Sequence, residues 1–89
     1  MLLSQDEINK SLSIYGWSYK DQMIAKSFKF QNYMEGIDFV NKIAKISETL
    51  NHHPNMVIDW CKIDISITSH DLGGVSTKCV NLATKIESL

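Results

Sequence analysis

Residues 51–70, with the sequence NHHPNMVIDWCKIDISITSH, decide the fold. Isoleucines and polar residues alternate over 63–67, which is the two-residue period of a strand with one buried face. Three apolar residues with the same spacing predict a partner strand before it: Met56, Ile58 and Trp60. The two runs predict an antiparallel hairpin that turns near Cys61 and Lys62. We expect Trp60 and the isoleucines to lie in the core.

A second hairpin is predicted nearer the N-terminus, over residues 17–30. Trp17 and Tyr19 alternate with polar residues and indicate its first strand. Asp21 and Gln22 are suited to the turn. The strand over 23–30 then places its two phenylalanines on one face.

Helices are predicted before, between and after the hairpins. Ser4 and Glu7 fit a capping box, in which each side chain satisfies a free backbone N–H of the first helical turn. The inner stripe of this first helix contains Ile8 and Leu12, and Gly16 is well placed to end it.

The second and third helices follow from apolar residues near a 3.6-residue period. The second, over residues 33–50, must end before Pro54, because proline disfavours a helical residue ahead of it. Its stripe is Tyr33, Ile37, Val40, Ala44 and Leu50, widened by Ile43 and Ile46. After Gly73 and Gly74, Ser76 can cap the third helix. The stripe of that helix is Cys79, Leu82, Ala83, Ile86 and Leu89.

The predicted order is α-β-β-α-β-β-α, an α+β fold in which a four-stranded antiparallel sheet has helices packed on one face. The 89 residues form one domain, residues 1–89, which is too short for a TIM barrel or a full dinucleotide-binding fold. A chain of this size buries only roughly 60–65% of its unfolded surface, so its core is thin. We therefore expect the chain to self-associate into an oligomer.

The charge composition argues against several classes of partner. Nine basic residues oppose ten acidic ones, and every basic residue is lysine. A nearly neutral chain without arginine is a poor candidate for direct contact with nucleic acid. No apolar run approaches the ~20 residues that span a bilayer, and no signal peptide is recognised. We expect a cytoplasmic protein with no membrane partner, nuclear localisation also being open, in which Cys61 and Cys79 are reduced.

All three histidines fall at one predicted end of the second hairpin. His53 precedes its first strand and His70 follows its second, so their side chains can face one pocket, with His52 in the same loop. Chance placement would rarely gather every histidine of a chain in this way. We therefore interpret the cluster as functional rather than as surface or packing residues.

Other residues are expected beside the histidines. Pro54 stiffens the step from the loop into the strand, and Gly73 and Gly74 let the backbone approach a ligand closely. The end of the second helix brings Glu48 and Asn51 to the same place.

Three kinds of chemistry could take place in such a pocket. A metal site is disfavoured, because adjacent histidines rarely chelate one ion well and no CxxC or HxxxH spacing is present. A Cys–His nucleophile is disfavoured because Cys61 is predicted at the far turn and Cys79 in the core. Proton transfer without a metal remains, and several imidazoles near Glu48 can supply both a base and an acid, as a dehydration requires.

These residues resemble the pterin-4a-carbinolamine dehydratases, also called DCoH, the dimerisation cofactor of a hepatocyte homeodomain factor. The matching positions are residues 48, 51–54, 60–67, 69–71, 74–76 and 81–83. The match is strongest over residues 48–86, and the length and element order of the whole chain also agree.

The resemblance implies an enzyme that needs no metal or organic cofactor. It would dehydrate 4a-hydroxytetrahydrobiopterin to quinonoid dihydrobiopterin, which recycles the cofactor of aromatic amino-acid hydroxylases. The implied catalytic residues are His52, His53 and His70, with His53 and His70 doing most of the proton transfer. The implied substrate-binding residues are Glu48, Asn51, Pro54, Ser69, Asp71 and Leu72. The absence of arginine suits a neutral bicyclic substrate that carries no phosphate.

The sequence departs from the family pattern at three places. Asn51 and Cys79 each stand where many members have Asp, and Trp60 and Cys61 replace a common Tyr-Asn pair. The first change removes a charge beside the histidines, and the second removes a polar group near the pocket. The resemblance implies assembly as a homodimer or homotetramer. The resemblance also implies an alternative function, a non-catalytic dimerisation or coactivator protein that binds a transcription factor.

Overall fold

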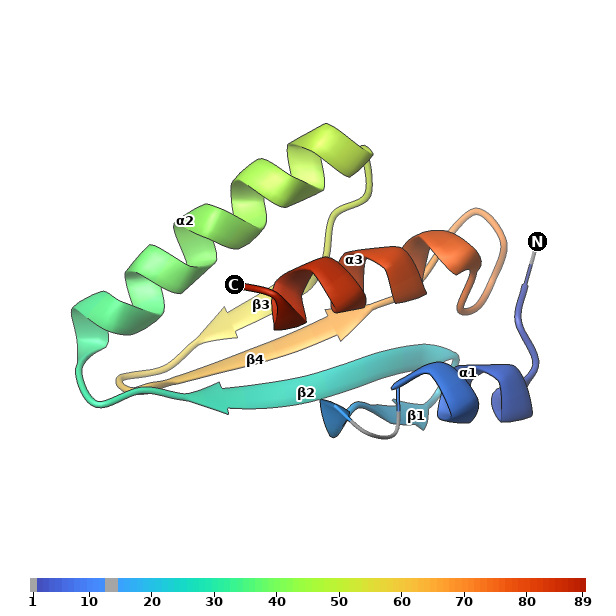
Figure 1. Ribbon diagram of the computed structural model, residues 1–89, viewed down its shortest axis with the longest axis horizontal. Helices are drawn as coiled ribbons and strands as arrows, with labels where there is room; N and C mark the ends of the chain where they lie inside the picture. The colour runs from blue at the N-terminus through green and yellow to red at the C-terminus, as the bar shows by residue number, and fades with distance from the viewer. Residues whose placement is uncertain (1, 13–14) are drawn as a thin grey trace.

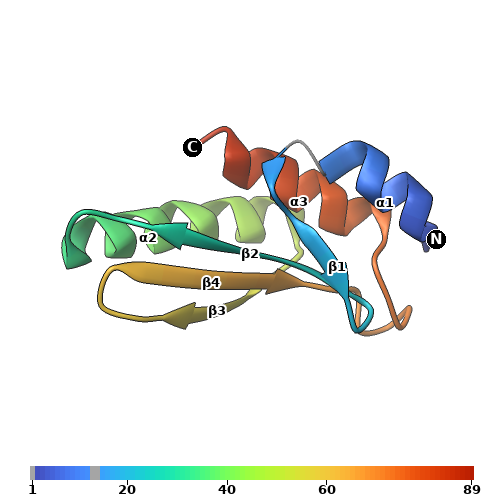
Figure 2. The same ribbon diagram turned by 90° about the horizontal axis from the view of Figure 1, so that it is seen from below.

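The computed structural model describes residues 2–12 and 15–89, and its elements follow the predicted order (Figure 1). They are α1 (Gln5–Leu12), β1 (Ser18–Lys20), β2 (Met23–Lys29), α2 (Tyr33–Leu50), β3 (Asn55–Ile58), β4 (Lys62–Ile67) and α3 (Thr77–Glu87). The strands form one antiparallel sheet in the order β1-β2-β4-β3. The helices cover one face of that sheet (Figures 1 and 2), so the predicted α+β class is confirmed.

The first two helices begin where local side chains satisfy their free N–H groups. The N–H of Ser4 donates to Glu7 Oε1 at 2.9 Å and the N–H of Glu7 donates to Ser4 Oγ at 3.2 Å, which confirms the predicted capping box. At α2 the side chain of Asn32 accepts from the N–H of Glu35 at 2.9 Å. The helix α1 ends at Leu12, and Gly16 has a φ of 82° just before the buried Trp17.

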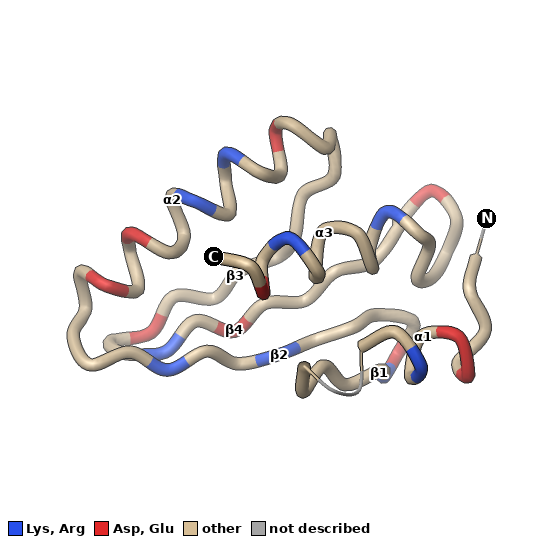
Figure 3. The backbone as a smooth tube through the Cα atoms, viewed as in Figure 1, with Lys and Arg blue, Asp and Glu red and all other residues tan. Residues whose placement is uncertain are grey.

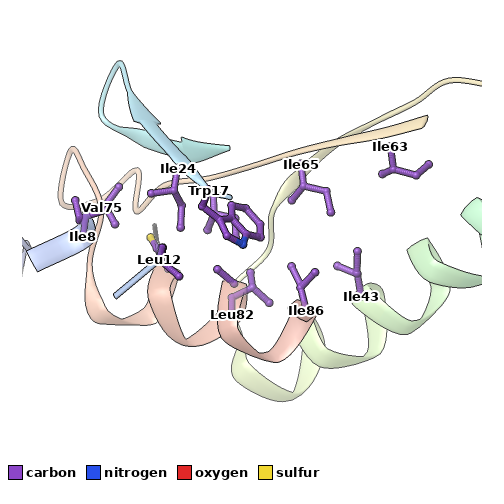
Figure 4. Close-up of a cluster of buried hydrophobic side chains, with 13 residues drawn as sticks. Ile8, Leu12, Trp17, Ile24, Ile43, Ile63, Ile65, Val75, Leu82 and Ile86 are labelled. Atoms are coloured by element: carbon purple, nitrogen blue, oxygen red, sulfur yellow. The ribbon is translucent and has the colours of Figure 1, made fainter. Parts of the chain in front are cut away.

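The central strand β4 alternates as predicted. Ile63, Ile65 and Ile67 are each 1% exposed, whereas the residues between them face the open side of the sheet. They pack with Ile24 of β2 and with apolar side chains of all three helices (Figure 4). This layer between the sheet and the helices is the core of the molecule.

The hairpin β3–β4 turns one residue earlier than predicted. Pairing of Asn55 with Ser66 and of Ile58 with Ile63 centres the hairpin between Trp60 and its neighbour Cys61. The strand β3 ends at Ile58. The N–H of Asp59 then donates to the carbonyl of Lys62, and the N–H of Trp60 donates to the side chain of Asp59, which closes the turn. Trp60 is therefore 76% exposed, and its predicted place in the strand and core is wrong.

The predicted stripes of two helices need correction. In α2 the buried residues are Gly36, Ile43 and Ser47, while Tyr33 and Ala44 are exposed. Most of the predicted stripe is confirmed, since Ile43 is buried and Val40, Ile46 and Leu50 pack against the core. A Cβ on Gly36 would lie 3.5 Å from the side chain of Ile63, so the helix approaches the sheet closely at this glycine. In α3 four of the five predicted residues are buried, but Leu89 is exposed since the helix ends at Glu87.

One partly buried ion pair joins the sheet to α3. Lys26 of β2 points toward the helices, and its Nζ lies 2.6 Å from Oε2 of Glu87. The same carboxylate oxygen accepts a hydrogen bond from the indole N–H of Trp17 at 2.9 Å. The exposed fractions of the Lys26 and Glu87 side chains are 21% and 16%, so water screens the pair only partly.

Elsewhere, acidic and lysine residues are interspersed along the backbone, including along α2 (Figure 3). The described surface therefore carries mixed charge rather than a field of one sign. Among the described residues, no helix has the length and apolar character needed to cross a membrane.

Candidate functional site

A cavity of about 230 Å³ lies at the open end of the β3–β4 hairpin. His53, just before β3, and His70, just after β4, both line it. The rest of the lining comes from Met23, Asn55, Ser66, Ile67 and Thr68. The hairpin thus brings together two histidines that are seventeen residues apart in the chain, as the sequence predicted.

The residue that turns the chain from α2 toward this cavity is Asn51. It is the C-cap of α2, with φ 51° and ψ 45°, and its N–H donates to the carbonyl of Glu48. Asn adopts this left-handed conformation more readily than most residues. The position therefore requires a particular backbone shape, whatever its side chain contributes to binding.

Glu48, in the last turn of α2, is the partner of His53. Its Oε2 lies 2.5 Å from Nε2 of His53. The two side chains are 78% and 55% exposed, so the pair adds little to the free energy of folding. Its geometry nevertheless orients the imidazole and places a carboxylate where it can balance a positive charge on His53.

His52 points elsewhere than its neighbour and does not line the cavity. Its Nε2 lies 3.3 Å from Sγ of Cys79, in the first turn of α3. Burial lowers the pKa of His52, and the charge of Lys78 adds to that effect, while Asp71 opposes it. These effects together favour the neutral form of the His52 imidazole.

The loop from β4 to α3 holds the remaining predicted site residues. The side chain of Ser69 is buried and forms a hydrogen bond with the side chain of Ser76, whereas Asp71 and Leu72 are exposed. The carbonyl of Ser69 accepts from the N–H groups of Leu72 and Gly73, which closes a tight turn. Pro54 is half-buried between Asn51 and β3. Contact of these residues with a substrate stays a prediction.

The two glycines of this loop have different roles. Gly73 has a φ of 73°, which favours glycine, and no atom lies within 4 Å of the position of a Cβ there. A Cβ on Gly74 would lie 3.2 Å from a methyl group of Leu2. Gly74 therefore makes room for Leu2 of the N-terminal segment. The approach of this backbone to a ligand stays a prediction.

Two features of the site were missed by sequence reasoning. Thr68 and Met23 line the cavity although neither stands out in the pattern. Cys79 is in the core as predicted, but it also contacts His52. The available signal was its place in the first turn of α3, just after the N-cap residue Ser76.

Two other observations bear on the choice of site. A larger hollow of about 510 Å³ lies on the open face of the sheet, but no histidine or cysteine lines it. Within residues 2–12 and 15–89, no group of three or more His, Cys, Asp or Glu side chains is arranged to hold a metal ion. The histidine cavity is therefore the better candidate for proton chemistry, despite its smaller volume.

The antiparallel sheet, the helices on one face of it and the two cavity histidines together define a class of small α+β protein. In this class, acid–base side chains lie at the open end of a hairpin. The family model described as pterin 4 alpha carbinolamine dehydratase matches residues 1–89. The chain belongs to this family.

The sequences of individual relatives match this chain along nearly their whole length. A protein of Sulfurisphaera tokodaii, provisionally named a pterin-4-alpha-carbinolamine dehydratase, is 39% identical, with 98% of this chain and 95% of the relative covered. A protein of Picosynechococcus with the same provisional name is 40% identical, with 98% and 96% covered.

Solved structures show the same fold. The crystal structure of a transcriptional coactivator/pterin dehydratase from Brucella melitensis has a TM-score of 0.92 at 27% identity, with 99% of this chain and 97% of that chain covered. A pterin dehydratase-like protein identified as a RuBisCO assembly factor has a TM-score of 0.67 at 22% identity, with 81% and 83% covered. The second likeness concerns the fold alone.

Proposed function

We propose that the protein dehydrates 4a-hydroxytetrahydrobiopterin, or a closely related pterin, to the quinonoid dihydropterin. The observation that carries this proposal is the shared cavity of His53 and His70 in a chain of the pterin-4a-carbinolamine dehydratase family. A volume of about 230 Å³ is below the ~300–1,000 Å³ of pockets for drug-sized ligands, which suits a small bicyclic ring.

The reaction needs two proton transfers. One imidazole takes the proton from N5, the electron pair forms the C4a=N5 double bond, and the C4a–O bond breaks. A second, protonated imidazole gives its proton to the departing hydroxyl, which leaves as water. His53 and His70 are the proposed pair, with Glu48 balancing the charge on His53 and His52 in support. Within this scheme no metal or organic cofactor is required, and the product would return to tetrahydrobiopterin recycling.

The test is a turnover assay with enzymatically generated 4a-hydroxytetrahydropterin. We expect wild-type protein to accelerate dehydration, and His53→Ala and His70→Ala each to lower the rate by roughly 10²–10⁴-fold. Ser27→Ala, in the hollow on the open face of the sheet, is the control and should keep the wild-type rate. Wild-type rates in both histidine variants would contradict the assignment.

A second candidate, a protein-binding role without catalysis, is favoured by the exposed edge of the sheet. Val57 and Ile58 of β3 are 53% and 46% exposed, and Trp60 beside them is 76% exposed. The Brucella melitensis relative is named both a coactivator and a dehydratase. An adaptor of this kind would show no turnover in the wild-type protein, which separates the two functions.

We also propose that the protein is a homodimer or homotetramer. In the part of the chain that the structure describes, no strand lies beside the outer side of β3, and exposed apolar side chains flank it. Such an edge favours addition of a strand from another chain. A second copy of this protein is the proposed occupant, since it would also extend a thin core.

A further inference from the structure

A buried polar cluster that is not part of the cavity lies against His52. Sγ of Cys79 is 3.3 Å from Nε2 of His52 and 3.4 Å from Oγ of Ser69, and that hydroxyl is 2.6 Å from Oγ of Ser76. Cys79, Ser69 and Ser76 are 0%, 3% and 2% exposed. Because bulk water hardly reaches these groups, their protons must find partners within the cluster.

The backbone at the start of α3 fixes part of the role of the sulfur. Ser76 is the N-cap residue, and its N–H donates to Sγ of Cys79 at 3.5 Å. A Glu or Gln side chain usually accepts this hydrogen bond in a capping box. The N–H can only donate, so it occupies an acceptor position on the sulfur and leaves the S–H free to donate elsewhere.

The hydroxyl protons fit the cluster better in one direction. If Ser76 donates to Ser69 and Ser69 donates to Cys79, both hydroxyl protons have partners, and the thiol proton is directed to Nε2 of His52. In the reverse direction Ser69 donates to Ser76, and the hydroxyl of Ser76 can then donate only to Sγ of Cys79, at 3.7 Å. The first arrangement satisfies the protons with the shorter contacts.

The surroundings of His52 agree with a ring that accepts at Nε2. Burial lowers its pKa, the positive charge of Lys78 acts in the same direction, and His53 and His70 add to this, against the negative charge of Asp71. A neutral imidazole carries one proton, so a ring that accepts at Nε2 carries it on Nδ1.

We propose that Cys79 is a positioning residue whose thiol donates to Nε2 of His52 and thereby holds the ring as the Nδ1–H tautomer. The catalytic consequence rests on the proposed function. A carboxylate can only accept, so Asp at this position would hold His52 with its proton on Nε2 instead. Cys79→Asp would therefore reverse the hydrogen-bonding direction of His52.

The decisive experiment is nitrogen-15 NMR of the histidine rings in the full-length protein, which reports the tautomer without any turnover. We expect His52 in wild-type protein to carry its proton on Nδ1, and Cys79→Ser, whose hydroxyl can also donate, to keep that tautomer. Cys79→Ala should release it. The control variant is Cys61→Ser, which changes the free cysteine at the turn of the β3–β4 hairpin and should leave the ring spectrum unchanged.

Cys79→Asp adds a second readout. A carboxylate beside His52 favours the charged ring and so raises the pKa of His52. At a pH below that pKa, each unit of increase lowers the fraction of neutral His52 about tenfold. The acid limb of the rate profile should then move to higher pH. The wild-type spectrum tests the proposal even where this variant fails to fold.

The outcomes separate the two proposals. A wild-type His52 with its proton on Nε2, or the same tautomer in wild-type protein and Cys79→Ala, would overturn the positioning role. An Nδ1–H ring in a protein without turnover would support the positioning role and overturn the proposed dehydration. Turnover by a protein whose His52 carries its proton on Nε2 would support the proposed dehydration and overturn the positioning role of Cys79.

Discussion

At the scale of single residues, Asn51 shows how one position can serve the fold and the site. Its left-handed backbone ends α2 and directs the next residues so that His52 faces α3 and His53 faces Glu48. Asp tolerates this conformation nearly as well as Asn. An Asn51→Asp variant would therefore add a charge beside the histidines without removing the turn.

A substitution at Asn51 should separate the backbone requirement from the side chain. We expect Asn51→Ala to lower the free energy of unfolding by about 1–2 kcal/mol, since alanine disfavours a φ of 51°. Asn51→Gly should lose less, because glycine accepts that conformation. Urea unfolding measures both, with Asn41→Ala on the exposed face of α2 as the control. Equal losses in the Ala and Gly variants would contradict a backbone origin.

His52 gives the stability a pH dependence with a definite sign. Its pKa in the folded protein is lower than the reference value of 6.5, so the unfolded chain binds the proton first as pH falls. Stability is unaffected well above 6.5 and decreases below it. We expect His52→Gln to show a smaller loss than wild-type protein between about pH 7.5 and about pH 5 in urea unfolding. An identical loss in both proteins would show that His52 contributes nothing.

At the scale of helices and strands, the contact of Glu87 with Lys26 and Trp17 holds α3 onto the sheet. Glu87→Gln leaves the partly buried ammonium of Lys26 without its countercharge, and we expect a loss of about 1–3 kcal/mol. Lys26→Met should cost less, because Glu87 keeps its hydrogen bond from Trp17. A double-mutant cycle measured by urea unfolding checks the coupling, and additive losses would exclude it.

Element types and limits were largely predictable because their causes are local. The period of β4, the capping box at Ser4 and the bounds of α2 each depend on neighbours within a few residues. The burial of Trp60 and Tyr33 was wrong for a different reason: it depends on where a hairpin turns and which helix face meets the sheet. Periodicity alone does not encode those tertiary choices.

The candidate site was predictable in the same partial way. Hairpin pairing was enough to bring His53 and His70 to one cavity. Which of two adjacent histidines would face that cavity depends on the rotation of the chain after Asn51. The partner of His52 on α3 follows from packing between elements far apart in sequence, so no local pattern predicted it.

At the scale of the whole molecule, the open edge of the sheet predicts self-association. We expect wild-type protein to sediment as a dimer or larger species at micromolar concentrations. Ile58→Lys places a charge on the β3 edge and should shift the protein toward monomer, since charged side chains block strand addition. Leu89→Lys, at an exposed apolar residue beyond α3, is the matched control. A wild-type monomer, or equal effects of both variants, would contradict the proposed interface.

The central place of β4 has a consequence for how the site responds to heat. This strand is hydrogen-bonded on both sides, by β2 and β3, and its isoleucines are fully buried. Amides in such a strand exchange with solvent only when the whole domain opens, whereas edge strands exchange through smaller fluctuations. Ser66 and Ile67 of β4 line the cavity, and His70 lies three residues beyond the end of that strand. We therefore expect this side of the cavity to keep its shape until the domain itself unfolds.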